Sequence, residues 1–302
     1  MEGHELSGAG QYRLIRTIRL RNENVPGVLG SWASKIGDLD ANIGNVETVQ
    51  IGMHYVVRDV DVLVHDEDHL KRVVKATAEL KGVSVMEVRD DVLDLHHGGK
   101  IEMVSRQSID SIDKLRKVYT PGVASVSRQI GEDPRQRDIY TSIPNLVAMV
   151  TDGTAVLGLG NVGAWASMPV MEGKAALLHE LVGLSGIPIL LDTQEPSEII
   201  STVKRIAMTF GAIQLEDIAA PRCFEVADQL ASELSIPVMH DDQSGTAVVV
   251  LAALLNACNA SGKDLHTVKI GQIGLGAAGM GIAKMLQHYT GNAVSGTDIA
   301  QE

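Results

Sequence analysis

Aromatic side chains are scarce in this sequence, because phenylalanine, tryptophan and tyrosine together make up only 3% of its 302 residues. The hydrophobic core must therefore be built mainly from Val, Ile, Leu, Ala and Met. With 30 glycines, this aliphatic composition favours an α/β protein of buried strands and glycine-rich turns. The length predicts roughly two domains, at about 150 residues per domain.

Cysteine and positive charge are also in short supply. Cys223 and Cys258 cannot form a disulfide framework, and they suit a reducing compartment. The 26 basic residues stand against 38 acidic ones, and this balance argues against nucleic-acid binding because phosphates require Lys and Arg. The start of the chain has no signal-peptide pattern, and the most apolar window, residues 247–260, is too short to span a membrane. We therefore expect a cytoplasmic protein without nucleic-acid or membrane partners.

Residues 11–92 alternate between strand-like and helix-like patterns. Residues 12–21 alternate apolar with basic side chains, as a half-buried strand does, and a loop containing Pro26 precedes a periodic helical segment. Two β-rich runs, an amphipathic helix and a strand over residues 83–88 follow. The order βαββαβ predicts a ferredoxin-like unit. Residues 1–10 are polar, and we expect them to be disordered.

The first turn of this unit resembles that of ACT domains, which are small regulatory modules. The resemblance rests on the Val25–Leu29 motif (VPGVL) after the first strand and on Asn42-Ile43 at the start of the second. It implies a small-molecule effector site or a subunit contact beside Asn24, Pro26 and Gly27. A plain ferredoxin-like domain without a ligand is the alternative.

Residues 93–110 are predicted to be a linker. Its adjacent His96 and His97 cannot share a helix face, which argues against a metal site there. From residue 111 to residue 262, short apolar strands alternate with amphipathic helices, which predicts a parallel sheet in an α/β fold. Residues 263–302 then begin a second strand–turn–helix unit.

Acidic residues follow two successive strands of the predicted sheet. Glu216 and Asp217 end one strand, and Asp241 and Asp242 end the next. Parallel strands place their carboxyl ends side by side, so these carboxylates would repel one another unless a cation lies between them. Oxygen ligands suit Mg²⁺ or Mn²⁺. Alternatively, Asp217 and Asp241 cap the following helices or pair with Arg222.

A lysine and a tyrosine stand where they could serve acid–base chemistry. Gly173 is followed by an apolar helical pattern, so we expect Lys174 near a helix N-terminus, where the pKa of its ammonium group would be lowered. Pro121 and Gly122 fix a turn that holds the hydroxyl of Tyr119 on a rigid corner. An exposed lysine and a packing tyrosine are the alternatives.

Two segments match the glycine pattern of dinucleotide-binding loops. The second follows a strand and precedes an uninterrupted helix, and its predicted cofactor-binding residues are Gly274, Gly276, Ala277, Ala278 and Gly279. Asp298 lies 19 residues after Gly279, where an acidic residue would bind a ribose diol, which favours NAD over NADP.

The first match is followed by Trp165 and Pro169, which are expected to interrupt a helix. A strand is expected over residues 155–159 before it. We interpret this segment as an active-site loop whose backbone N–H groups contact the cofactor. Its candidate residues are Gly158, Gly160, Asn161 and Gly163.

Six motifs occur in the order YTPGVA, TDGTAVLGLGNVG, PVMEGKA, LEDIAAPRCF, PVMHDDQSGTA and GLGAAG. In order and spacing they resemble a malic enzyme of the short bacterial form over residues 111–302. The resemblance implies oxidative decarboxylation of L-malate to pyruvate and CO₂ with NAD, or less readily NADP, and with Mg²⁺ or Mn²⁺, in a homodimer. It also implies roles for single residues: Tyr119 as general acid, Lys174 as general base, Glu216, Asp217 and Asp242 as metal ligands, and Asp241 as a carboxylate behind them.

The sequence departs from that family at several points. Residues 154–156 lack the arginine with which larger malic enzymes hold a substrate carboxylate, and Ser244 replaces a histidine of many short forms. The asparagines that hold malate in the family have no counterpart here. Residues 263–302 would form an incomplete Rossmann-type domain, so we expect a fragment with weak NAD binding and poor malate turnover. The alternatives are a regulatory or dimerisation piece, and another metal-dependent decarboxylating 2-hydroxy-acid dehydrogenase.

Overall fold

The computed structural model describes residues 14–299, which divide into two compact units at the Gly98–Gly99 peptide. The expected disorder of residues 1–10 and the first residues of the expected strand over residues 12–21 lie outside the described residues.

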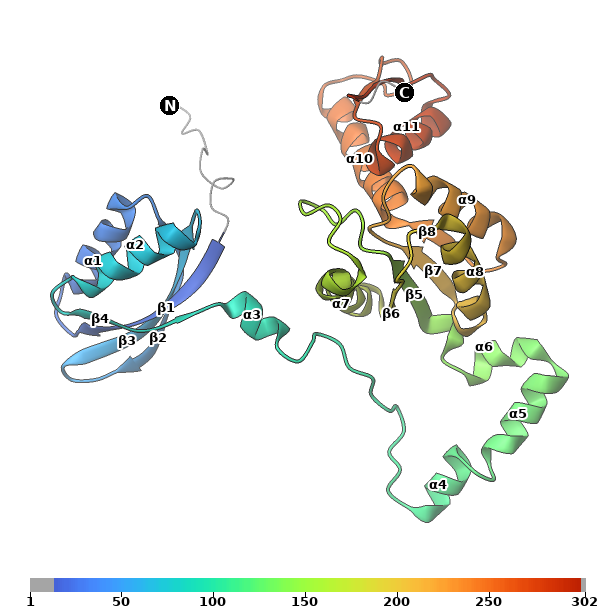
Figure 1. Cartoon of the computed structure of the whole chain (residues 1–302), viewed down its shortest axis with the longest axis horizontal. Helices are drawn as coiled ribbons and strands as arrows, with labels where there is room; N and C mark the ends of the chain where they lie inside the picture. Colours follow the sequence, from blue (N-terminus) through green and yellow to red (C-terminus); the bar gives the residue numbers. More distant parts are fainter. Residues whose placement is uncertain (1–13, 300–302) are drawn as a thin grey trace. The chain divides into compact units, whose positions relative to one another are not determined.

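The N-terminal unit has the predicted ferredoxin-like order of elements. These are β1 (Leu14–Glu23), α1 (Val28–Asp38), β2 (Asn42–Ile51), β3 (Tyr55–Val64), α2 (Glu67–Ala78) and β4 (Val83–Arg89). The four strands form one antiparallel sheet in the order β2-β3-β1-β4. Both helices cover the same face of this sheet (Figure 1). The βαββαβ prediction is confirmed.

The two faces of this sheet differ in chemistry. Ile18 lies opposite Val60 in the β1–β3 register, and both are fully buried in the core with Trp32 of α1. On the other face Arg19 and Arg89 each donate hydrogen bonds of 2.7 Å to Asp59. One face is therefore held by apolar packing and the other by a shared carboxylate.

The segment that follows is helical but weakly packed. It contains α3 (Asp91–His96), α4 (Ile112–Val118), α5 (Val123–Glu132), η1 (Pro134–Gln136), α6 (Arg137–Tyr140) and η2 (Ile143–Asn145). None of residues 101–146 is buried. These short helices thus have no core of their own in the described chain.

A parallel four-stranded sheet organises the C-terminal unit, as predicted. Its strands are β5 (Leu146–Thr151), β6 (Ser185–Leu190), β7 (Ala212–Leu215) and β8 (Val238–His240), in the order β6-β5-β7-β8. The surrounding helices are α7 (Ala164–Val182), α8 (Pro196–Ile206) with the short η3 (Ala207–Thr209), and α9 (Arg222–Glu233).

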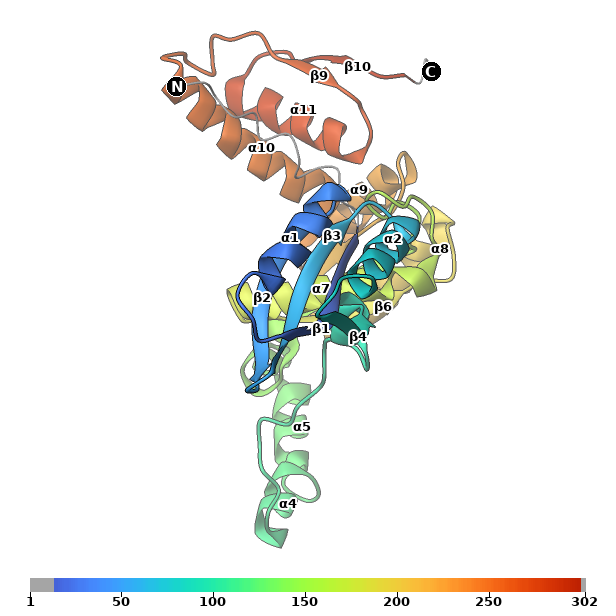
Figure 2. The ribbon, with the colours of Figure 1, turned by 90° about the vertical axis from the view of Figure 1, so that its left-hand side faces the viewer.

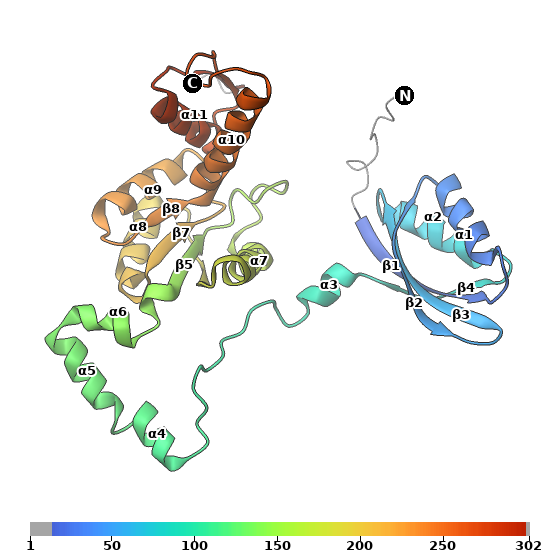
Figure 3. The same cartoon turned by 180° about the vertical axis from the view of Figure 1, so that it is seen from behind.

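These helices cover opposite faces of the sheet (Figures 1 and 3). Val150 of β5 and Leu215 of β7 pack with α8 and α9, while Met149 of β5 packs with Met171 of α7. Adjacent residues of one strand point to opposite faces, so β5 is buried on both sides. The edge of the sheet formed by the carboxyl ends of the strands is left for polar residues.

The last elements begin a second α/β unit. They are α10 (Asp241–Ala260), β9 (Gly271–Ile273), α11 (Ala277–Thr290) and β10 (Ser295–Thr297). Strands β9 and β10 pair in parallel, and α10 packs along α11 (Figure 2). This is the predicted first βαβ of a Rossmann-type fold. By length and composition alone, α10 is also apolar enough to cross a membrane.

Two local expectations in the C-terminal unit were wrong. Residues 155–159 form no strand; an isolated bridge between Val156 and Gly160 closes a loop instead, because Gly158 and Gly160 have left-handed φ angles of 77° and 72°. Pro169 does not interrupt the helix after Gly163, since α7 runs continuously across it. Burial of Met171 beyond the proline holds the helix together.

Candidate active site

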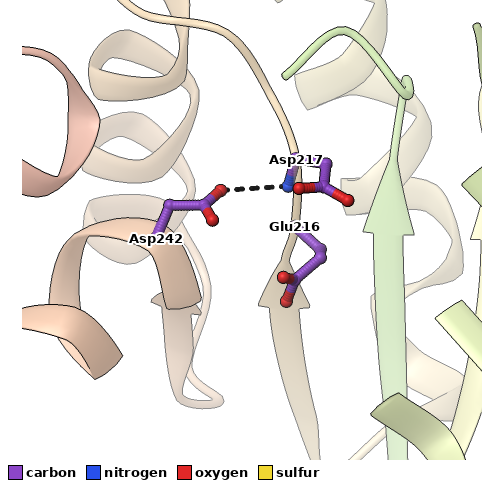
Figure 4. Close-up of side chains that lie close together, drawn as sticks. All are labelled: Glu216, Asp217 and Asp242. Atoms are coloured by element: carbon purple, nitrogen blue, oxygen red, sulfur yellow. Dashed lines mark hydrogen bonds between the residues drawn. The ribbon is translucent and has the colours of Figure 1, made fainter. Parts of the chain in front are cut away.

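Three carboxylates converge at the carboxyl edge of the parallel sheet (Figure 4). Glu216 and Asp217 follow β7, and Asp242 lies in the first turn of α10. One oxygen of each side chain lies within 4.8 Å of the others. The Asp242 carboxylate also accepts a 3.0 Å hydrogen bond from the backbone N–H of Asp217. The structure thus brings together the three residues predicted as metal ligands.

Asp217 is held in an unusual backbone conformation. Its φ is +54°, a left-handed value that costs energy for residues other than glycine, although Asp tolerates it better than most. Its carbonyl accepts hydrogen bonds from the N–H groups of Thr154 (3.1 Å) and Ala155 (2.9 Å). The loop after β5 therefore fixes the carboxylate that follows β7.

The side chains of this cluster fit a hard divalent cation. Among the described residues, the buried Oδ2 of Asp217 has no hydrogen-bond partner. Burial raises the pKa of Glu216 to about 7, although the neighbouring Lys174 opposes this. Burial and the charge of Asp242 raise the pKa of Asp217 to about 6. A cation would supply the missing partner and the opposite charge.

Lys174 reaches into this cluster from α7. Its Nζ lies 2.9 Å from Oε1 of Glu216 and 2.5 Å from Oδ2 of Asp241. The expected position near a helix start was wrong, because Lys174 lies in the middle of α7. Burial favours a lower pKa for its ammonium group, but the bonds to Asp241 and Glu216 outweigh burial and raise the pKa above the ordinary value. The expected lowering of the pKa of Lys174 is thus wrong.

A second polar group, centred on Asp152, was not predicted from the sequence. Asp152 is 3% exposed; its carboxylate lies 3.2 Å from the guanidinium of Arg222 and accepts hydrogen bonds from the N–H and hydroxyl of Thr154. The Thr154 hydroxyl in turn accepts from the N–H of Ala219. Arg222 thus pairs with Asp152 and not with Asp217 or Asp241, the partners expected from the sequence. The polar TDGT run directly after a buried strand was the available signal.

Tyr119 is the predicted residue that the structure does not bring to the cluster. It follows α4 and is 68% exposed. Its backbone N–H and carbonyl complete helical turns with Leu115 and Val123. Within residues 14–299 its hydroxyl has no hydrogen-bond partner. Its assignment as general acid stays a prediction.

The loop between β9 and α11 has the geometry of a phosphate-binding turn. Gly274 has a left-handed φ of 86°, and a Cβ on Gly279 would lie 1.9 Å from the Gly274 carbonyl oxygen. The helix can approach the strand this closely only with glycine at 279. Gly276 has open space around it, and Ala277 and Ala278 begin α11.

Asp298 lies beside this loop. Its carboxylate accepts a 2.5 Å hydrogen bond from the backbone N–H of Leu275. In the earlier loop Gly158, Gly160 and Gly163 all have positive φ and open surroundings. Asn161 lies between them and is exposed. Both loops present backbone where a ligand could approach, and their roles in cofactor binding stay predictions.

The turn expected to bind an effector is exposed. Asn24 donates a 3.1 Å hydrogen bond from its side chain to the carbonyl of Gly52, which ties the turn to the β2–β3 hairpin. Gly27 has a φ of 91° and precedes α1, and Pro26 lies beside it at the surface. Effector binding at this turn stays a prediction.

Comparison with known proteins agrees with this fold. The family model for the malic enzyme N-terminal domain matches residues 98–197, the one for the malic enzyme NAD binding domain matches residues 243–301, and the one for the ACT domain matches residues 13–87. The fold and cluster define an α/β protein with a carboxylate site and the start of a dinucleotide-binding domain. The chain belongs to the malic enzyme family and carries an ACT domain at its N-terminal side.

Two similar relatives and one similar solved structure are also malic enzymes. NAD-dependent malic enzyme 1 of Bacillus subtilis (strain 168) is 55% identical over 286 residues, which cover 94% of this chain and 65% of the relative. The NAD-dependent malic enzyme of Geobacillus stearothermophilus is 46% identical and covers 89% of this chain and 56% of its own length. The crystal structure of malic enzyme from Pyrococcus horikoshii matches with a TM-score of 0.68 and 44% identity, over 70% of this chain and 51% of that one. The chain therefore spans about two thirds or less of these relatives.

Proposed function

We propose that this chain carries the metal and substrate site of an NAD-dependent malic enzyme, which oxidises and decarboxylates L-malate to pyruvate and CO₂. The observation that carries the proposal is the convergence of Glu216, Asp217 and Asp242 with Lys174 at the carboxyl edge of one sheet. Carboxylates bind a divalent metal and a lysine moves a proton, and this reaction needs both.

Glu216, Asp217 and Asp242 would hold Mg²⁺ or Mn²⁺. When bound, the ion supplies Lewis-acid polarisation of the C2 oxygen of the substrate. Asp241 lies behind these ligands and orients Lys174 through their 2.5 Å hydrogen bond. Both aspartates come from the first turn of α10, so one helix end sets the position of a ligand and of the base.

Lys174 would accept the proton of the C2 hydroxyl as hydride leaves for the nicotinamide. The carboxylates of Glu216 and Asp241 accept from Lys174 and favour its ammonium form. A cation held by Glu216 would offset part of that negative charge and would favour the neutral form of Lys174, which can accept a proton.

Tyr119 would protonate the substrate carbon after loss of CO₂. Its helix α4 has no buried residue, and the apolar side chains of Ile112, Leu115 and Val118 are all exposed. We propose a homodimer in which residues 101–142 pack on a second copy and carry Tyr119 to the neighbouring site. Such packing would bury the apolar side chains that this segment leaves in solvent.

NAD would bind at the two glycine loops, with Asp298 released from Leu275 to accept hydrogen bonds from the ribose hydroxyls.

The N-terminal unit would bind a small regulatory molecule at the turn of Asn24, Pro26 and Gly27. Free Cys223 and Cys258 support a cytoplasmic location.

Metal binding tests the site directly. Titration of the chain with Mn²⁺, followed by electron paramagnetic resonance, should show one site of micromolar to millimolar affinity. Glu216→Gln, Asp217→Asn and Asp242→Asn should each weaken it at least about tenfold, because each removes one charged ligand. Asp228→Asn, on the exposed side of α9, is the matched control and should leave the affinity unchanged. Equal affinity in all four variants would refute the metal site.

The reaction is tested by single-turnover formation of NADH with L-malate, Mn²⁺ and excess protein. Lys174→Ala should abolish the signal and retain Mn²⁺ binding, whereas Lys204→Ala, an exposed lysine of α8, should change neither. Binding of Mn²⁺ without any NADH in the unmodified chain would instead favour a regulatory or dimerising piece. NADH formed from another 2-hydroxy acid but not from malate would favour a different decarboxylating dehydrogenase.

A further inference from the structure

The first residues of the C-terminal unit contact α7 immediately before Lys174. The Nζ of Lys100 donates a 2.7 Å hydrogen bond to the carbonyl of Pro169. The backbone N–H of Lys100 donates a 3.2 Å hydrogen bond to Oε2 of Glu172. Both the backbone and the side chain of Lys100 thus contact one turn of α7.

The glycines on both sides of this contact fit it closely. Gly99 has a φ of +86°, and a Cβ there would lie 2.8 Å from Oε1 of Glu172. On the helix, a Cβ on Gly173 would lie 3.9 Å from the Nζ of Lys100, so the lysine end lies directly over that glycine. A larger residue at 99 would push Glu172 away and strain the backbone. The left-handed backbone at Gly99 therefore favours glycine at this contact.

The contacted turn of α7 contains two residues that weaken a helix. Pro169 has no N–H, so the helix lacks one of its hydrogen bonds there, and Gly173 has low helix propensity. Met171 and Ala175 are buried and hold the inner side of the turn against the sheet. Lys100 contacts this turn through its hydrogen bond to the Pro169 carbonyl. Lys174 follows this turn directly.

We propose that Lys100 is a positioning residue for Lys174, because it contacts the turn of α7 that precedes that lysine. The proposal rests on the proposed function, in which Lys174 is the base. Loss of the hydrogen bonds of Lys100 loosens the turn and displaces the Nζ of Lys174 from Glu216 and Asp241.

Hydrogen–deuterium exchange of the whole 302-residue chain tests the contact without any need for activity. Lys100→Met keeps the length of the side chain and removes the charge; it should speed exchange of the amides of residues 170–176 about fivefold. Lys100→Arg should restore the exchange rate, because its guanidinium can still donate to the Pro169 carbonyl. Gly99→Ala should act like Lys100→Met. Lys204→Met, which removes an exposed ion pair of α8, should not alter α7.

A kinetic readout separates positioning from simple stability. In single-turnover NADH formation, Lys100→Met should lower the rate about fivefold and leave the Mn²⁺ and malate affinities within about twofold, with rescue by Lys100→Arg. Unchanged α7 exchange in Lys100→Met, or an equal loss in Lys100→Arg, would overturn the proposal. Absence of Mn²⁺ binding in the unmodified chain would refute the proposed function instead, and the exchange experiment would still decide whether Lys100 supports the turn.

Discussion

The ammonium group of Lys174 lies 2.9 Å from Oε1 of Glu216, a residue that is only 2% exposed. Glu216 is one of three carboxylates that converge at the edge of the sheet, so the proposed base and a proposed metal ligand are bound to each other in the metal-free chain. A cation and the lysine therefore compete for the same carboxylate. The protonation of this group should govern how the site responds to pH.

Metal affinity should rise steeply between pH 5.5 and 7.5. The pKa of Glu216 is raised to about 7 and that of Asp217 to about 6, so a cation must displace protons from both below neutral pH. Raised pKa values also mean that the metal-free fold is favoured below the unfolded pKa values, and that this contribution is lost as the pH rises through 6 to 7. Mn²⁺ titrations at pH 5.5, 6.5 and 7.5 should show at least a tenfold gain overall. An equal Mn²⁺ affinity at all three pH values would contradict the raised pKa values of Glu216 and Asp217.

The left-handed backbone of Asp217 predicts an order among its variants. Both Asp217→Gly and Asp217→Ala remove a carboxylate and should bind Mn²⁺ weakly. Glycine adopts a φ of +54° without steric cost, so Asp217→Gly should be about 1 kcal/mol more stable than Asp217→Ala. Urea unfolding of the two metal-free variants measures the difference. A more stable alanine variant would show that the backbone relaxes at this site.

Acid should weaken the N-terminal unit through Asp59. The hydrogen bond from Arg19, supported by Arg89 and opposed by burial, lowers the pKa of Asp59 to about 2. A lowered pKa stabilises the fold above the unfolded value of about 4, and this stabilisation is lost as the pH falls towards 2. Asp59→Asn should cost about 1–2 kcal/mol at pH 7 and remove this acid dependence. Asp68→Asn, an exposed partner of Lys71, is the control and should have little effect in thermal unfolding.

A methyl group at Gly281 should separate α10 from α11. A Cβ there would lie 2.5 Å from the backbone oxygen of Gln243, which cannot move without shifting the first turn of α10. Gly281→Ala should therefore destabilise the C-terminal unit by about 1–3 kcal/mol and weaken Mn²⁺ binding through Asp242. Gly30→Ala, in α1 with open space around it, should be neutral or stabilising by about 0.5–1 kcal/mol. Unchanged unfolding of Gly281→Ala would contradict the close helix contact.

Much of the architecture could be predicted from local pattern. Alternation of apolar residues located the ferredoxin-like strands and the buried strands of the parallel sheet, because burial of one or both faces dictates the residue types at each position. The rule that parallel strands align their carboxyl ends predicted that Glu216, Asp217, Asp241 and Asp242 gather at one edge, and the family resemblance singled out the three that the structure brings together. The glycine pattern predicted the loop before α11, because the close approach of helix and strand at Gly279 leaves no room for a side chain.

What only the tertiary structure decided were interactions between segments far apart in the chain. The sequence placed Lys174 at a helix start, whereas packing of Met171 carries α7 across Pro169 and puts Lys174 in mid-helix. Its pKa is set by Glu216 and Asp241, which are 42 and 67 residues away, and so no local pattern could give its direction. The left-handed backbone of Asp217 likewise depends on hydrogen bonds from another loop. Local sequence determines which elements form, while the charge and geometry of the site arise from the contacts that folding makes between them.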